Sequence, residues 1–199
     1  MKGYLVLDIG NVCVHLDFDA MANGWGYQTK EELFSSSSAK LIEQYMAEYQ
    51  SDDYQVQSFF DKILPLLPCQ SLAEVEVGYR AVVGSQIAEI SSIVKYAVNH
   101  DWCLIFLSDI CDIHWKMVQK VIDFEDKIQH FVFSYEVGAV KPHKPMFEAV
   151  EKLRANLSLP VLYADDKPAN IEAGLSFGWE SFQIGSYEPL IHALEKYSQ

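Results

Sequence analysis

Short apolar runs recur along the chain and most are followed by polar or turn-forming residues. They cover residues 3–9, 102–107, 131–134, 160–164 and 181–184. Runs of this length, bounded by turn residues, are typical of buried β-strands. We therefore predict a strand at each of these positions.

Amphipathic segments fill the intervals between these runs. Residues 113–122 and 145–153 repeat apolar side chains at helical spacing, and residues 168–178 begin with Pro168 and close on Gly178. Proline in the first turn and glycine at the end are common helix boundaries. A helix over 85–100 is also predicted. Strands that alternate with helices indicate a parallel sheet covered on both faces, that is, a Rossmann-like doubly wound α/β fold.

Residues 18–85 interrupt this alternation, because their apolar stripes read as consecutive helices. Thr29 with Glu32 and Ser71 with Glu74 have the spacing of capping boxes, which mark helix starts. We therefore predict a small helical cap domain inserted into the α/β core. The predicted boundaries are 1–17 and 86–199 for the core and 18–85 for the cap.

Aromatic residues in this inserted region have an ordinary structural explanation. Tyr54, Phe59 and Phe60 occur in segments with apolar stripes. Large aromatic side chains are mostly buried, and we expect these three to belong to the core of the cap rather than to a ligand site.

The net charge of −13, from 15 basic and 28 acidic residues, changes which partners are plausible. Binding to nucleic acids or to anionic membranes depends on clustered lysine and arginine. We therefore expect neither a nucleic-acid partner nor a membrane partner. No apolar run approaches the roughly 20 residues of a membrane helix. No secretory signal is recognisable, and the four cysteines form no CxxC pair. We expect a soluble cytoplasmic protein with reduced thiols.

Polar residues follow the predicted strands where ligands bind in parallel sheets, beyond their carboxyl ends. They are Asp8, Ser108, Asp109, Lys141, Lys144, Asp165 and Asp166. Singly, each has an ordinary explanation. An Asp or Ser after a strand often caps a turn or helix, a loop lysine is usually solvated, and paired acids favour a helix start.

Together these residues are chemically coherent. Three acids at one edge of a sheet repel one another unless a cation offsets them, and carboxylate oxygens suit Mg²⁺. A lysine and a hydroxyl beside such an ion would complete a cradle for a phosphoryl group, whose transfer depends on positioning and charge stabilisation. A carboxylate can also act as the nucleophile.

Four stretches occur in the order of the motifs of a known family. "VLDIGNV", "LIFLSD", "VKPHKPMF" and "LYADDKPANIEAG" resemble the four motifs of the haloacid dehalogenase (HAD) superfamily. That family is dominated by Mg²⁺-dependent phosphatases with an aspartyl-phosphate intermediate. The glycine two positions after Asp8 is similar to the branch typified by α-D-glucose-1-phosphate phosphatase.

The resemblance implies a role for each matching residue. Asp8 would be the nucleophile and a metal ligand, with the Gly10 carbonyl and Asp166 as further ligands and Asp165 in support. The phosphoryl group would contact Ser108, Asp109 and Lys141. Asn170 would brace the fourth motif. The resemblance favours Lys141 over Lys144, and it implies that the inserted helices close over the site.

Two positions depart from the pattern of the family. Most of its phosphatases carry an acid where this chain has Gly10, and that acid donates a proton to the leaving group. General acid catalysis is worth about 10²- to 10⁴-fold. His15 or Asp17, just beyond this loop, would be substitutes, although the sequence favours a turn or hinge role for each of them. Asp109 replaces an Asn, so it would repel phosphate unless it points away or holds the loop through backbone amides.

Three functions are compatible with these features. The first is a Mg²⁺-dependent phosphatase acting on a small phosphorylated metabolite, with sugar phosphates among the candidates. The second is a weak or inactive relative that binds a phosphorylated ligand or a protein partner, which Gly10 and Asp109 favour. The third is a metal-free haloacid dehalogenase, which the paired acids Asp165 and Asp166 disfavour. The oligomeric state, monomer or homodimer, stays open.

Overall fold

A parallel sheet of five strands forms the centre of the core. The computed structural model describes residues 1–51 and 56–199, and Tyr54 lies outside the described residues. The strands are β1 (Gly3–Leu7), β4 (Trp102–Ser108), β5 (His130–Phe133), β6 (Val161–Asp165) and β7 (Glu180–Gln183), in the spatial order β5-β4-β1-β6-β7. All four pairings are parallel. The predicted strands and the doubly wound α/β fold are confirmed.

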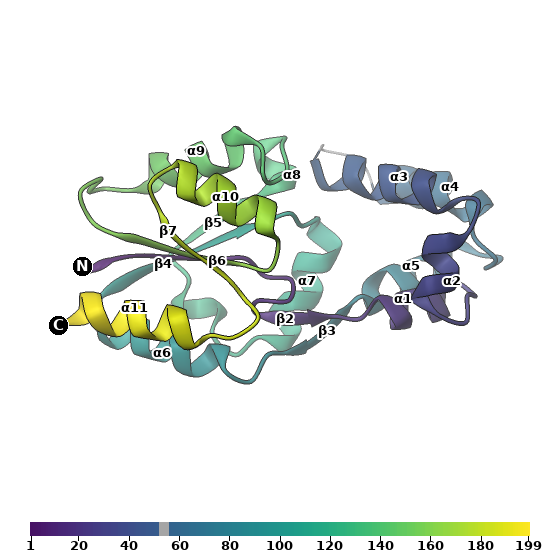
Figure 1. The fold of residues 1–199 in the computed structure, drawn as a ribbon. Coiled ribbons are helices and arrows are strands. Elements are labelled where there is room, and N and C mark those ends of the chain that lie inside the picture. Colours follow the sequence, from purple (N-terminus) through teal and green to yellow (C-terminus); the bar gives the residue numbers. More distant parts are fainter. Residues whose placement is uncertain (52–55) are drawn as a thin grey trace.

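Helices cover both faces of this sheet (Figure 1). On one side are α6 (Ile90–Asn99), α7 (Asp112–Val121) and α11 (Glu188–Ser198), and on the other are α9 (Lys144–Leu153) and α10 (Pro168–Ser176). Strand β1 is buried along its whole length, with Leu5 and Leu7 on the first face and Tyr4 and Val6 on the second. A strand covered on both sides has no polar face, which explains its continuous apolar sequence.

A second group of helices lies beyond the carboxyl ends of the strands (Figure 1). It contains α1 (Phe18–Gly24), α2 (Lys30–Ser35), α3 (Ala39–Ser51), α4 (Val56–Ile63) and α5 (Leu72–Ala81), with a 3₁₀ turn at Leu64–Leu66. We refer to residues 18–82 as the helical insertion. A second hydrophobic cluster fills it and extends to Cys111 and Ile113 at the start of α7, and Phe59 and Phe60 are buried there as predicted. None of the helices in the described ranges is long and apolar enough to cross a membrane.

A two-stranded antiparallel ribbon, which the sequence did not predict, joins the helical insertion to the core. It pairs β2 (Val14–Leu16) with β3 (Val83–Gln86). The predicted helix over 85–100 is therefore wrong at its start, because α6 begins at Ile90. Neither of these segments contains an apolar run like those of the predicted strands, and their pairing joins positions far apart in the sequence.

The two capping boxes start α2 and α5 as predicted. The Thr29 and Ser71 side chains accept hydrogen bonds from the backbone N–H groups of Glu32 and Glu74. Each glutamate reaches back to the residue before the cap, and Glu32 Oε2 accepts from Gln28 N at 2.6 Å. These contacts satisfy amide groups that have no partner within the helix.

His114 links the core to the helical insertion. It is buried on α7, and its Nε2 donates to the carbonyl of Tyr79 on α5 across 2.8 Å. The two rings lie 4.1 Å apart between centroids. The donated hydrogen bond satisfies a carbonyl near the end of α5, where no intrahelical donor follows. Burial lowers the pKa of His114 to about 4, so the ring is neutral at pH 7.

We expect His114 to make the folded state sensitive to acid. A histidine in the unfolded chain has a pKa of about 6.5, so the unfolded state binds the proton first as the pH falls. The contribution is present above pH 6.5 and is lost between pH 6.5 and about 4. At pH 5 the stability lost in this way has reached about 2 kcal/mol. Urea unfolding at pH 8 and pH 5 should show a smaller loss in His114→Gln than in the wild type.

The control for this comparison is His192→Gln, because His192 is exposed on α11. Its loss of stability between the two pH values should equal that of the wild type. Equal losses in His114→Gln and the wild type would contradict the prediction.

Candidate active site

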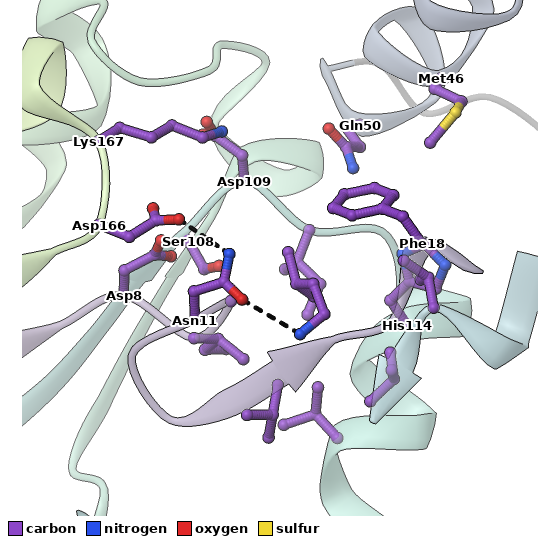
Figure 2. Close-up of a pocket in the computed structure, with 18 of the residues that line it drawn as sticks. Asp8, Asn11, Phe18, Met46, Gln50, Ser108, Asp109, His114, Asp166 and Lys167 are labelled. Atoms are coloured by element: carbon purple, nitrogen blue, oxygen red, sulfur yellow. Dashed lines mark hydrogen bonds between the residues drawn. The ribbon is translucent and has the colours of Figure 1, made fainter. Parts of the chain in front are cut away.

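The sheet order brings the predicted site residues to one edge. Asp8 follows β1, Ser108 ends β4, Asp165 ends β6 and Asp166 follows it. Strand β1 lies between β4 and β6, so the carboxyl ends of these three strands are adjacent. Figure 2 shows Asp8, Ser108 and Asp166 pointing toward one another at this edge.

Lys141 reaches the same edge from the segment between β5 and α9. Its Nζ lies 2.9 Å from Asp8 Oδ1 and 2.6 Å from Asp165 Oδ2, and it donates to the Leu107 carbonyl at 3.0 Å. The side chain is only 1% exposed. Burial alone would lower the pKa of Lys141, but the two carboxylates raise it above its ordinary value, so the ammonium stays charged.

Lys144, the alternative lysine, lies outside this cluster. It begins α9, is 73% exposed and forms an i,i+4 ion pair with Glu148. The two lysines are only three residues apart in the sequence, yet one is buried between acids and the other is solvated.

Asp165 is fully buried, and its two oxygens accept hydrogen bonds from several donors. The donors are Lys141 Nζ, the Tyr163 hydroxyl, the Asn170 amide and the backbone N–H of Lys167. Burial would raise the pKa of Asp165, but the Lys141 ammonium and these hydrogen bonds lower it below its ordinary value. Asp165 is thus an ionised anchor that fixes Lys141 and Asn170.

The carboxylate oxygens of Asp8 and Asp166 accept fewer hydrogen bonds from the protein than those of Asp165. Burial raises the pKa of Asp8 to about 6 against the opposing charge of Lys141. Asp166 is half-buried and accepts a hydrogen bond from the Asn11 amide at 2.9 Å (Figure 2). Asp8, Asp165 and Asp166 each offer an oxygen within 4.8 Å of the others. Such an all-oxygen donor set, with net negative charge, fits Mg²⁺.

Asp109 holds the loop that carries Lys141. Its Oδ1 accepts a hydrogen bond from the backbone N–H of Lys141 at 2.8 Å. This contact matches the alternative in which the carboxylate binds backbone amides. Burial raises the pKa of Asp109.

The two substitutes considered for the missing acid at residue 10 lie away from the cluster. Asp17 caps α1, where its Oδ1 accepts from Ala20 N at 2.8 Å. His15 is exposed on β2 and faces a different hollow, lined by α11 residues such as Glu188. Neither lines the cavity that contains Gly10.

That cavity has a volume of about 430 Å³ and lies between the cluster and the helical insertion. Several of its lining residues were not assigned to the site from the sequence. They are Asn11 and Lys167 on the core side and Phe18, Phe34, Glu43, Met46, Ala47 and Gln50 on the insertion side. Asn11 and Lys167 lie within the first and fourth motif stretches, and this was the signal for them in the sequence. The insertion residues carried no signal, because apolar side chains on amphipathic helices are usually core.

Known structures share this fold. No family model matches the chain. A HAD family enzyme from Bacteroides thetaiotaomicron is 20% identical, with a TM-score of 0.77 over 96% of this chain and 98% of that one. A second structure of that enzyme, in complex with magnesium and inorganic phosphate, is 18% identical, with a TM-score of 0.75 over 94% and 98%.

Two further similarities extend this comparison. A predicted HAD-like family hydrolase from Porphyromonas gingivalis is 15% identical, with a TM-score of 0.75 over 98% of both chains. The L-2-haloacid dehalogenase from Xanthobacter autotrophicus is 14% identical, with a TM-score of 0.60 over 98% of this chain and 83% of that one. The chain therefore has the fold of HAD family enzymes.

Proposed function

We propose that this protein is a Mg²⁺-dependent phosphatase that hydrolyses a small phosphorylated metabolite through an aspartyl-phosphate on Asp8. The observation that carries the proposal is the buried Lys141 ammonium, 2.9 Å from Asp8 and 2.6 Å from Asp165, in the cluster that the half-buried Asp166 completes. A lysine ammonium and a site for Mg²⁺ lie beside the same carboxylate, Asp8. Two positive charges placed there would stabilise a phosphoryl group that carries two negative charges. A HAD family enzyme of the same fold has been crystallised with magnesium and phosphate.

Asp8, Asp166 and the Gly10 carbonyl would hold the metal, with Asp165 in support. The bound ion would neutralise charge on the phosphoryl oxygens. Asn11 orients Asp166 through its amide, and its own oxygen accepts from Leu16 N. Oriented ligands lower the cost of assembling a metal site.

The remaining steps are performed by side chains of the chain. A carboxylate oxygen of Asp8 attacks phosphorus and the bond to the leaving-group oxygen breaks, after which water cleaves the acyl phosphate and regenerates Asp8. Lys141 offsets the charge gathered between nucleophile and phosphoryl group. The Ser108 hydroxyl would donate a hydrogen bond to a phosphoryl oxygen, and Lys167, which also lines the cavity, would bind another.

Gly10 supplies no acid for the leaving group. Substrates whose leaving groups need no proton, such as acyl phosphates, should therefore be hydrolysed faster than alkyl phosphates. The same glycine makes the chain similar to the α-D-glucose-1-phosphate phosphatase branch, so sugar phosphates belong in any substrate panel.

Removal of the metal should abolish the activity. Purified protein with Mg²⁺ and acetyl phosphate should release inorganic phosphate, and EDTA should lower the rate at least about a hundredfold, because a Lewis acid contributes several kcal/mol. Excess Mg²⁺ should restore it. Phosphate release that persists in EDTA would contradict the proposal.

Two alternatives have distinct outcomes in the same assay. Gly10 favours a weak or inactive relative, which would bind a phosphorylated ligand without turnover. Structural similarity to L-2-haloacid dehalogenases favours a dehalogenase, which would release halide from a 2-haloacid without metal.

A further inference from the structure

The helical insertion presents a mainly apolar surface to the cavity above Asp8, with one polar residue at either end of its α3 stripe. Phe18 begins α1 and Phe34 lies in α2, and their rings contact edge to face with centroids 5.7 Å apart. Met46 and Ala47 on α3 continue this surface. Figure 2 shows Phe18 and Met46 on the side of the cavity opposite Asp8 and Asp166.

Helix α3 contributes these residues from one face. Glu43, Met46, Ala47 and Gln50 line the cavity and are spaced i, i+3, i+4 and i+7, which is one side of a helix. The apolar pair lies in the middle of the stripe, with one polar residue at either end. Of the insertion residues in the described ranges, Glu43 and Gln50 are the polar ones at this wall.

Phe34 is 40% exposed although it is aromatic. Its position on the cavity accounts for the exposure, since Phe34 lines the cavity and its ring contacts that of Phe18. An open aromatic surface beside a charged cluster separates the cavity into two chemical halves, one for an anion and one for an apolar group.

We propose that the leaving group of the substrate is a flat apolar group, such as an aromatic ring, which packs against Phe18, Phe34 and Met46. This inference rests on the proposed phosphatase function and assigns its substrate class. It departs from the sugar phosphates that the sequence resemblance suggested. A sugar would bury several hydroxyl groups against Phe and Met side chains that cannot form hydrogen bonds with them.

Binding of phosphonates tests the inference without requiring turnover. In 3-phenylpropylphosphonate and 3,4-dihydroxybutylphosphonate, a methylene replaces the ester oxygen of 2-phenylethyl phosphate and of glycerol phosphate. Calorimetry with the Mg²⁺-loaded protein should show at least about tenfold tighter binding of the phenyl compound, the scale typical of an added apolar group in an apolar pocket. Equal binding, or preference for the dihydroxy compound, would overturn the inference.

Variants of Phe34 test whether the preference for the phenyl phosphonate comes from this wall of the cavity. Phe34→Gln should reduce the preference for the phenyl phosphonate about tenfold, and Phe34→Leu should retain most of it because leucine is also apolar. Val77→Gln on α5 is the matched control, since Val77 is 64% exposed and does not line the cavity. A preference that survives Phe34→Gln would overturn the assignment of this wall.

Turnover separates this inference from the proposed function. Acetyl phosphate has almost no leaving group to accommodate, so its hydrolysis reports on the chemistry alone. Hydrolysis of acetyl phosphate with no preference among phosphonates would overturn only the inference. Preference for the phenyl compound with no hydrolysis of acetyl phosphate would support the apolar wall and overturn the phosphatase.

Discussion

Asp8→Asn is expected to lower kcat for acetyl phosphate by on the order of 10⁴-fold or more, the usual effect of removing a nucleophile. An amide oxygen is too weak a nucleophile to displace the leaving group from phosphorus, so the acyl phosphate cannot form. Asparagine has nearly the shape of aspartate, which leaves the cavity unchanged. Phosphate release with Mg²⁺ in excess, compared with the wild type, measures the effect.

The fold should survive this substitution. Burial raises the pKa of Asp8 to about 6, which means that ionised Asp8 is unfavourable in the metal-free protein. The thermal midpoint of Asp8→Asn in EDTA should therefore be at least that of the wild type. A loss of activity together with a lower midpoint would indicate a structural role instead.

The control is Asp126→Asn, because Asp126 is 71% exposed, pairs with Lys127 and does not line the cavity. Its activity should equal that of the wild type. If Asp8→Asn retained more than about a tenth of the activity, Asp8 would not be the nucleophile.

Lys141→Met should both unfold the protein more easily and abolish activity. Methionine fills a similar volume but leaves Asp8 and Asp165 buried without their cation. Breaking a buried ion pair in this way costs about 3–5 kcal/mol. The free energy of unfolding should fall by that amount in urea titrations at pH 7.5, and phosphate release should fall to background.

Lys144→Met provides the matched comparison. Lys144 is exposed and its pair with Glu148 is solvated, so its loss should change stability by no more than about 0.5 kcal/mol. Activity should be retained. Similar losses of stability in the two variants would contradict the assignment of Lys141 as the buried cation.

The strands and most helices of the core could be predicted because their signals are local. The continuous apolar sequence of β1 indicates burial on both faces, and Pro168 marks the start of α10. The ribbon of β2 and β3 could not be predicted, since its stability comes from pairing residues 14–16 with residues 83–86 and not from either segment alone.

The same distinction holds for the candidate site. The order of strand ends was enough to nominate Asp8, Ser108, Lys141 and the paired acids, because parallel strands deliver their carboxyl ends to one edge. The sequence did not indicate that Asp165 and Asp166 differ in burial and in hydrogen-bond partners. Asp165 ends β6 and is buried among donors, whereas Asp166 follows the strand, is half-buried and accepts a hydrogen bond from Asn11.

Hydrophobic periodicity and the order of the segments along the chain are therefore enough to specify the α/β core and to place the acids and the lysine at its edge. Which oxygens stay free for a cation, that His15 and Asp17 lie outside the cavity, and that Phe18, Phe34 and Met46 form its far wall are visible only in the folded protein. These facts depend on how separate helices pack over the sheet, and packing brings together residues whose local patterns carry no record of one another.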